Sequence, residues 1–147
     1  MGSSFVAYRG YGFWARDPSL EVWLHLLCAE VDRAEDVPAW LFAARDDWHH
    51  QATVGFVGCV SPSLDQHLGT DDARVASVLA LGGRARDRLV AATPVIPKDV
   101  LNSFGTGGPG SFFTTDVARE AFVNVAEAFL ALLRGEITTD VSSSPVF

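Results

Sequence analysis

The chain has 147 residues, of which 48% are hydrophobic and 11% aromatic, a composition that excludes a disordered protein. No run of 18 consecutive apolar residues occurs, and residues 1–12 lack the apolar segment of a secretory signal, so neither a membrane-spanning helix nor an exported protein is expected. Two cysteines are too few for a disulfide framework, which favours free thiols and a cytoplasmic location.

Charge is distributed unevenly along the chain. The formal net charge is −7, and residues 1–72 hold eleven carboxylates against four arginines, whereas residues 73–147 hold seven charges of each sign. A negative field of this kind repels nucleic-acid phosphates and anionic lipids and attracts basic partners. The sequence therefore predicts no nucleic-acid or membrane partner, although a modest negative charge also serves solubility.

Residues 1–16 form an aromatic arm. Its large rings fall at irregular spacing, at Phe5, Tyr8, Tyr11, Phe13 and Trp14. Gly10 and Gly12 argue against a long regular strand. We expect an extended arm that packs on the helices, with a short β-ribbon built from residues 5–14 and 53–60. The alternatives are an exposed aromatic contact surface and the self-complementary patch of a homodimer.

The clearest helix spans residues 17–33. Asp17 is a favourable N-cap, and Pro18 suits the first helical position, where its missing N–H costs nothing. Apolar residues recur on one face and widen it until little polar surface remains: Leu20, Val22, Trp23, Leu24, Leu26, Leu27, Cys28 and Val31. A helix this apolar is typically buried among others, so we expect it to be central, with Cys28 as a buried free thiol.

A second helix is predicted to begin at Pro38 and to run to Ala52. The short connection between the two helices predicts an antiparallel pair. Acidic residues surround this connection, and Asp46 and Asp47 follow on the second helix. Whether these two lie near the acidic connection or at the far end of the pair stays open at this stage.

The remainder is predicted to be helical with interruptions. Thr70 is a favourable N-cap for a helix over residues 73–92, in which Gly82 and Gly83 indicate a kink or a close helix–helix approach. Arg84, Arg86 and Arg88 form a basic run on this helix, but Asp87 interrupts it, and the net charge opposes nucleic-acid binding.

Glycines dominate the segment before the last helix. Residues 105–111 lack the lysine of a phosphate loop and predict a turn with positive φ angles. The final helix is expected over residues 116–136, followed by a polar, mobile tail at 138–147. Together these elements predict a mainly α fold, a single domain over residues 1–147 with four to five helices.

A metal site is the chemical alternative. His25 on the first helix and Asp46, His49 and His50 on the second carry ligand types that two facing helices can bring together. No H-E-x-x-H or C-x-x-C spacing accompanies them, however. A metal-dependent enzyme is therefore the second hypothesis. The first hypothesis, protein binding, is given below and assigns no catalytic residue and no cofactor.

The preferred hypothesis is protein binding by an acidic, aromatic surface. Its candidate residues are Glu30, Asp32, Glu35, Asp36, Asp46, Asp47 and Trp48. A compact helical chain with an acidic half and no catalytic signature resembles the immunity proteins of bacterial toxin–immunity pairs. The resemblance implies a protein that binds and neutralises a basic cognate toxin, and the steering of a cationic partner by such a surface agrees with it.

Overall fold

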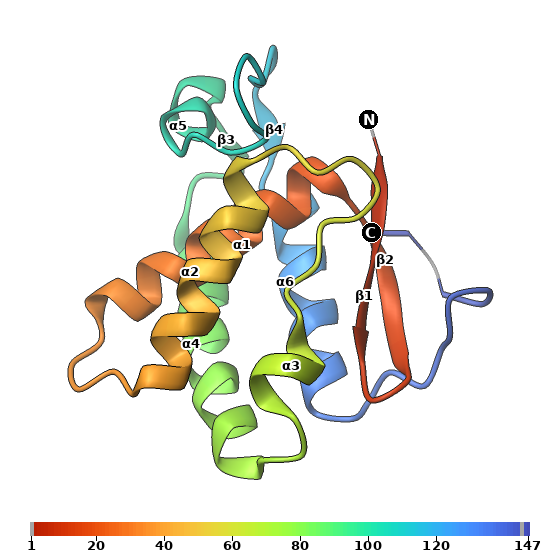
Figure 1. Ribbon diagram of the computed structural model, residues 1–147. Coiled ribbons are helices and arrows are strands. Elements are labelled where there is room, and N and C mark those ends of the chain that lie inside the picture. The colour runs from red at the N-terminus through yellow and green to blue at the C-terminus, as the bar shows by residue number, and fades with distance from the viewer. Residues whose placement is uncertain (1, 145) are drawn as a thin grey trace.

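The computed structural model describes residues 2–144 and 146–147, which fold around one hydrophobic core (Figure 1). The helices in this part of the chain are α1 (Asp17–Arg33), α2 (Ala39–Thr53), α3 (Leu64–Leu68), α4 (Asp72–Ala91), α5 (Lys98–Ser103) and α6 (Glu120–Leu133). The strands are β1 (Ser3–Tyr8), β2 (Tyr11–Arg16), β3 (Val95–Ile96) and β4 (Val117–Ala118). The predicted mainly α class is confirmed. The predicted bundle of four to five helices is not, because α3 and α5 are short additional helices and a hairpin covers one side.

The N-terminal arm forms a β-ribbon, as predicted, which is the antiparallel hairpin of β1 and β2. Arg9 and Gly10 both have positive φ, 52° and 85°, which is the geometry of the two-residue turns that suit the twist of hairpins. Val6 pairs with Phe13, and both side chains face the core, as the preferred prediction of packing required. The predicted ribbon partner was wrong, because β1 pairs with β2 while residues 54–63 form a loop.

The C-terminal segment lies along β2, on the side away from β1. The Gly12 N–H donates to Thr139 O at 3.0 Å, the Arg16 N–H donates to Phe147 O at 2.9 Å, and the Phe147 N–H donates to Trp14 O at 2.8 Å. The Phe147 ring also meets the Phe13 ring edge-on, with centroids 5.9 Å apart. The free edge of β2 thus supplies hydrogen-bond partners for this tail that its polar composition did not reveal, while the mobility of the tail stays a prediction.

Helix α1 is central, as predicted, and packs against α2, α4, α6 and the hairpin (Figure 1). Its Trp23 ring lies 5.5 Å from the Phe129 ring of α6. Asp17 does not cap this helix, because its carboxylate accepts hydrogen bonds from Ser4 Oγ at 2.6 Å and from the Gly58 N–H at 2.8 Å. Asp17 thus joins α1 to β1 and to the loop after α2.

Two helix starts differ from their predictions. Asp71, not Thr70, caps α4, with its Oδ1 accepting from the backbone N–H groups of Ala73 and Arg74 at 3.0 and 3.2 Å. Helix α6 begins at Glu120 rather than near residue 116, because residues 117–118 pair with residues 95–96 as β4 and β3. No helix in the described residues combines the length and the apolar character needed to cross a membrane.

The predicted turn with positive φ angles over residues 105–111 is confirmed. Gly105, Gly107, Gly108 and Gly110 all have positive φ, between 70° and 88°. A Cβ on Gly108 would lie 2.6 Å from Val54 O. The backbone of residues 105–111, here called the glycine loop, therefore approaches the backbone at the end of α2 closely. The glycine loop and residues 54–58 thereby meet over the N-terminal end of α1.

Candidate functional site

The structure separates the seven predicted partner-binding residues into an exposed group and a buried group. Glu30 is 2% exposed and Trp48 is fully buried, so neither contributes to an exposed face, and their prediction as surface residues is corrected. Trp48 packs in the core and donates from its indole N–H to Pro62 O at 2.8 Å. Because its N–H has a partner, the indole of Trp48 can be buried without an unpaired polar group.

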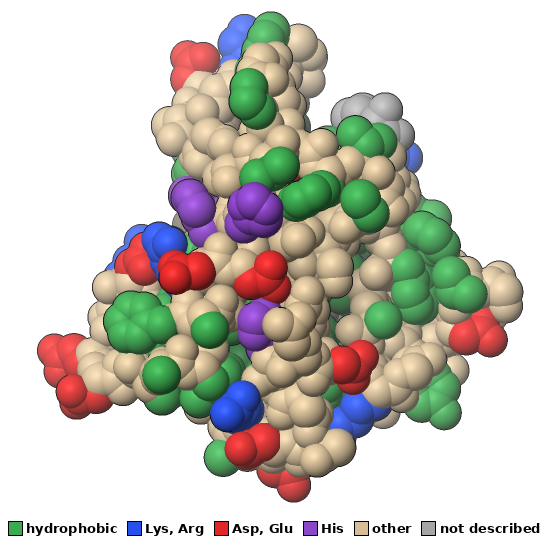
Figure 2. All heavy atoms as spheres, viewed as in Figure 1, with side chains coloured by type: hydrophobic (Ala, Val, Ile, Leu, Met, Phe, Trp, Pro, Cys, Tyr) green, Lys and Arg blue, Asp and Glu red, His purple; other side chains and the backbone are tan. Residues whose placement is uncertain are grey.

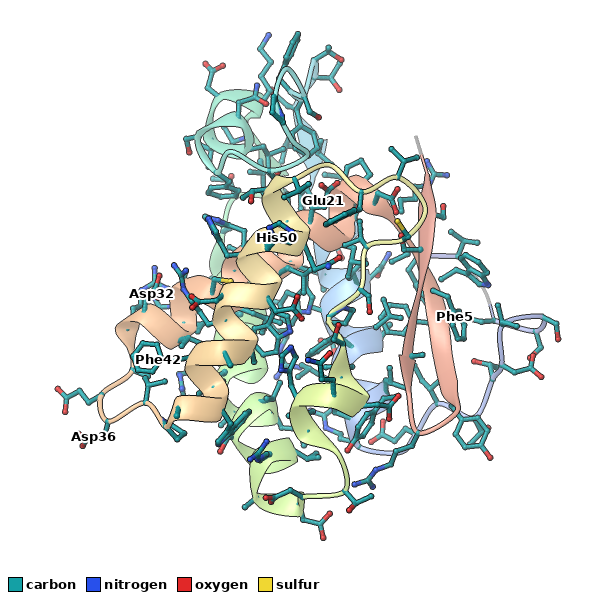
Figure 3. The ribbon with its side chains drawn as sticks, viewed as in Figure 1. Phe5, Glu21, Asp32, Asp36, Phe42 and His50 are labelled. Atoms are coloured by element: carbon teal, nitrogen blue, oxygen red, sulfur yellow. The ribbon has the colours of Figure 1, made fainter. Side chains whose placement is uncertain are left out.

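The exposed group lies on the same side of the molecule as an aromatic residue, Phe42, that helical spacing did not single out. Phe42 is 54% exposed on the outward side of α2, and Asp46 lies one helical turn further along the same side. Figure 3 shows Phe42, Asp32 and Asp36 on one side of the molecule, and Figure 2 shows acidic side chains on either side of a hydrophobic patch over α2 and the α1–α2 turn. We call this surface the α2 face; it consists of Asp32, Glu35, Asp36, Phe42, Asp46 and Asp47.

The contacts of Arg45 place Asp46 beside Asp32, near the acidic connection between α1 and α2. Its guanidinium binds Asp32 at two points, Nε–Oδ1 and Nη2–Oδ2, both 3.0 Å, and its Nη1 lies 3.5 Å from Asp46 Oδ1. One arginine on α2 therefore holds carboxylates of α1 and α2 side by side. Because its charge offsets only one of them, the α2 face keeps an excess of negative charge.

Asp47 lies at the other edge of the α2 face, where it reaches α3. Its Oδ2 and the Nε2 of His67 form a hydrogen bond of 2.7 Å, and His67 is mostly buried beside the Trp48 ring. The pair connects α2 to α3 and orients the Asp47 carboxylate. Sequence spacing gave no signal for this contact, because the two residues are 20 positions apart in separate helices.

Of the residues of the predicted metal site, His25 and His49 lie near each other, but they do not form a ligand set with Asp46 and His50. His25 stacks on Phe104 with ring centroids 4.4 Å apart, His50 meets the Phe56 ring at 5.6 Å, and Asp46 is held by Arg45. Across residues 2–144 and 146–147, no three His, Cys, Asp or Glu side chains lie close enough together to hold a metal ion. The structure therefore gives no support to the metal-dependent alternative.

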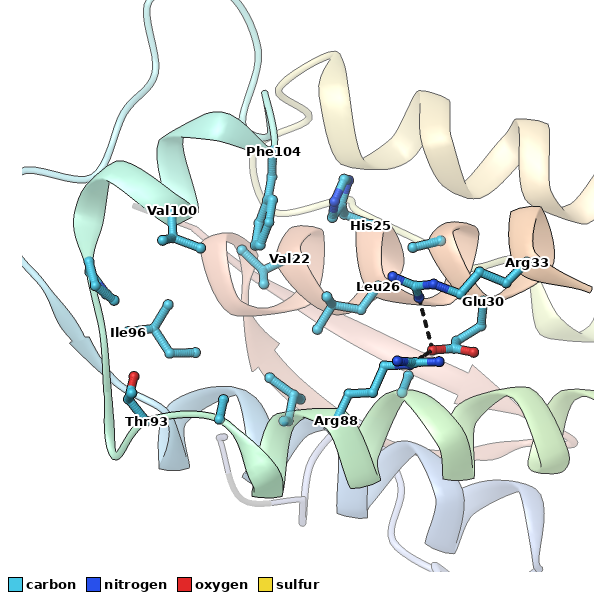
Figure 4. Close-up of a pocket in the computed structure, with 15 residues that line it drawn as sticks. Val22, His25, Leu26, Glu30, Arg33, Arg88, Thr93, Ile96, Val100 and Phe104 are labelled. Atoms are coloured by element: carbon cyan, nitrogen blue, oxygen red, sulfur yellow. Dashed lines mark hydrogen bonds and ion pairs between the residues drawn. The ribbon is translucent and has the colours of Figure 1, made fainter.

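A cavity of about 370 Å³ opens between α1, α4 and the segment β3–α5 (Figure 4). Its walls are mostly aliphatic, with Val22, Leu26, Leu89, Ile96 and Val100 among them, and the stacked His25 and Phe104 rings border it. Burial lowers the pKa of His25, and nearby His49 adds to the effect, so this imidazole is neutral at pH 7. This part of the cavity lining is therefore uncharged.

The charged part of the cavity lining holds an arginine cluster. Three guanidinium groups converge on the buried Glu30 carboxylate: Arg88 Nε at 2.6 Å, Arg33 Nη1 at 3.1 Å and Arg84 Nε at 3.7 Å. Helical spacing puts Arg84 and Arg88 on one face of α4, which is the signal that the interrupted basic run obscured. Arg86, between them, turns instead to Glu127 at 3.0 Å.

A second, smaller cavity of about 130 Å³ lies where the glycine loop crosses the start of α1. Asp17 and Glu21 both line it, and Glu21 Oε2 is buried without a hydrogen-bond partner among the described residues. Burial raises the pKa of Glu21 to about 7, and the negative charge of Asp17 adds to the rise. Glu21 therefore carries a proton for part of the time at neutral pH.

Comparisons of this chain with protein-family models, with curated proteins and with solved structures found no match.

Proposed function

We propose that this chain is a protein-binding domain of the immunity type, which binds a basic toxin through the α2 face and thereby neutralises it. The observation that carries the proposal is Phe42, a large apolar side chain that stays 54% exposed on the same side of the molecule as Asp32 and Asp36. Aromatic side chains that become desolvated at the centre of an interface, with polar groups around them, supply most of the binding free energy in protein complexes.

Charge supports a basic partner. The α2 face carries five carboxylates, and Arg45 is the guanidinium bound among them. The remaining negative charge steers a cationic protein toward Phe42 and raises its association rate. The acidic composition of residues 1–72, which resembles that of immunity proteins, supports a toxin as the class of partner.

The internal pairs prepare the α2 face for binding. Asp32 is held by a two-point contact with Arg45, and Asp47 is held by His67. Carboxylates that are already ordered lose less conformational entropy when a partner binds them. We therefore expect these side chains to keep their positions in the complex.

The test is capture of the partner from lysate of the source organism on four immobilised variants beside the wild-type chain. Phe42→Ala and Asp46→Lys alter the α2 face. Phe112→Ala and Glu136→Lys make the same changes at exposed positions outside it. The captured protein is then expressed alone and together with this chain, and cell growth is measured.

The expected partner is a basic protein that binds in a salt-sensitive manner. Phe42→Ala is expected to weaken its binding by roughly 30-fold, the effect of losing about 2 kcal/mol at an interface centre. Asp46→Lys is expected to slow association at low salt, and the two control variants are expected to bind like the wild type. A captured protein that is not toxic when expressed alone, or that binds all variants equally, would contradict the proposal.

A further inference from the structure

The arginine cluster contains more positive charge than the burial of Glu30 requires. A buried carboxylate needs a counter-charge and hydrogen bonds, and one guanidinium supplies the charge. Here Arg33, Arg84 and Arg88 all pair with Glu30, which leaves a formal excess of +2 on a chain whose net charge is −7. Among the described residues, the three arginines form no ion pair with any other carboxylate, so nothing else in this part of the chain offsets the excess.

The excess charge stands beside an apolar cavity. Arg33 and Arg88 line the 370 Å³ cavity together with aliphatic side chains. Beside it, Arg33, Arg84 and Arg88 line a further hollow of about 290 Å³. All three side chains are more than half exposed, so a molecule in solution can reach their remaining N–H groups. Figure 4 shows the Glu30–Arg33–Arg88 group on one side of the cavity and the Phe104 and Val100 side chains on the other.

The volume suits a small molecule. Ligand cavities in proteins range from about 300 to 1,000 Å³, with mostly apolar walls and a few polar groups that fix the ligand's orientation. An apolar cavity of about 150 Å³ holds one benzene ring. The present cavity therefore has room for a longer apolar group, and its charged lining residues, Glu30, Arg33 and Arg88, lie together on one side.

From this arrangement we infer that the cavity binds a small amphiphilic carboxylate, with its hydrocarbon chain between α1, α4 and α5 and its carboxylate on Arg33 and Arg88. The planar guanidinium fork matches a carboxylate at two points, and such charged hydrogen bonds are among the stronger ones. A cationic amphiphile is excluded by the same charge. No residue of the α2 face lines the cavity, so this inference is independent of the proposed function.

The test is calorimetric titration of the full chain with straight-chain carboxylates from butanoate to decanoate, and with octylammonium as the cationic counterpart of octanoate. Affinity is expected to rise about fourfold for each added methylene until the cavity is full, the value for burying one CH₂. Octylammonium is expected not to bind.

Variants locate the binding. Arg33→Gln and Arg88→Gln each leave Glu30 with two arginines and are expected to weaken octanoate binding about tenfold or more, by loss of a charged hydrogen bond. Ala29→Phe fills the cavity without changing its charge and is expected to abolish binding of the longer chains. Arg86→Gln, on the same helix but paired with Glu127, is the matched control and is expected to bind normally.

Circular dichroism and thermal unfolding show which variants are folded. If an arginine variant does not fold, Ala29→Phe still tests the inference. One-to-one octanoate binding that weakens in the folded cavity variants and persists in Arg86→Gln supports the inference. Absence of saturable binding at millimolar octanoate, equal binding of octylammonium, or equal affinity in all folded variants would overturn it.

Discussion

Glu21 lies one helical turn after Asp17, and the two carboxyl groups, 4% and 5% exposed, are both buried at the start of α1. Asp17 has partners in Ser4 and Gly58, whereas one oxygen of Glu21 has none among the described residues. Burial of Glu21, together with the negative charge of Asp17 beside it, outweighs a backbone hydrogen bond at Gly107 and raises the pKa of Glu21 to about 7.

This relationship predicts a stability that falls with rising pH. The unfolded chain loses the Glu21 proton near the ordinary pKa of 4.5, but the folded chain keeps it until about pH 7. Between these values the folded state binds more protons, so the free energy of unfolding decreases as pH rises, by up to about 3 kcal/mol in total. In Glu21→Gln the group cannot ionise, and this decrease is expected to disappear.

Urea denaturation from pH 4 to pH 8 checks the pH prediction. Glu21→Gln is expected to match the wild type near pH 4 and to exceed it in stability at pH 8. Glu136→Gln, at an exposed position, serves as the control and is expected to follow the wild-type curve. Parallel curves for the wild type and Glu21→Gln would show that Glu21 ionises normally in the folded chain.

The adjacent glycines of α4 are expected to respond differently to alanine. A Cβ on Gly83 would meet no atom within 4 Å, whereas a Cβ on Gly82 would lie 2.8 Å from Leu130 Cδ2. Gly83→Ala is therefore expected to stabilise the protein by about 1 kcal/mol, the difference in helix propensity. Gly82→Ala gains the same propensity but displaces the fully buried Leu130, so no net stabilisation is expected. Thermal unfolding of both variants measures the difference, and equal gains would mean that α4 and α6 are not in close contact at Gly82.

The two cysteines are expected to differ in reactivity. Cys28 is buried on α1, and burial raises the pKa of its thiol to about 12, so almost no thiolate is present at neutral pH. Cys59 is exposed in the loop after α2. Iodoacetamide is expected to modify Cys59 in the folded protein and Cys28 only after denaturation, as peptide mass spectrometry can determine. Rapid alkylation of Cys28 without denaturant would contradict the burial of this side chain.

The C-terminal segment is expected to protect the amides of β2 from hydrogen exchange. The N–H groups of Gly12 and Arg16 donate to Thr139 O and Phe147 O, so their exchange requires this segment to leave β2. The Gly10 N–H, in the exposed turn, is the internal comparison. Exchange of Gly12 and Arg16 as fast as that of Gly10, measured by NMR, would instead agree with the predicted mobility of the tail.

The candidate site was only partly predictable. The sequence placed Asp32, Glu35, Asp36 and Asp46 correctly on the outside, because charged residues at a helix end or turn are rarely buried without partners. The burial of Glu30 was not predicted, because its partners Arg84 and Arg88 lie on another helix. Arg88 is 58 positions away from Glu30 in the chain. Phe42 was missed because helical spacing of apolar residues identifies the buried face of α2 and gives no signal for an apolar residue on the exposed face.

The sequence by itself determined the elements whose causes are local. Pro18 in the first turn and apolar residues at helical spacing favour α1, and the glycines at positions 105, 107, 108 and 110 favour a turn with positive φ angles. Tertiary structure decided how charges pair, that residues 3–8 pair with 11–16, and that the tail joins β2. The physical reason is that helical spacing acts within a few residues, whereas burial of a carboxylate or pairing of a strand edge depends on groups that only the folded chain brings together.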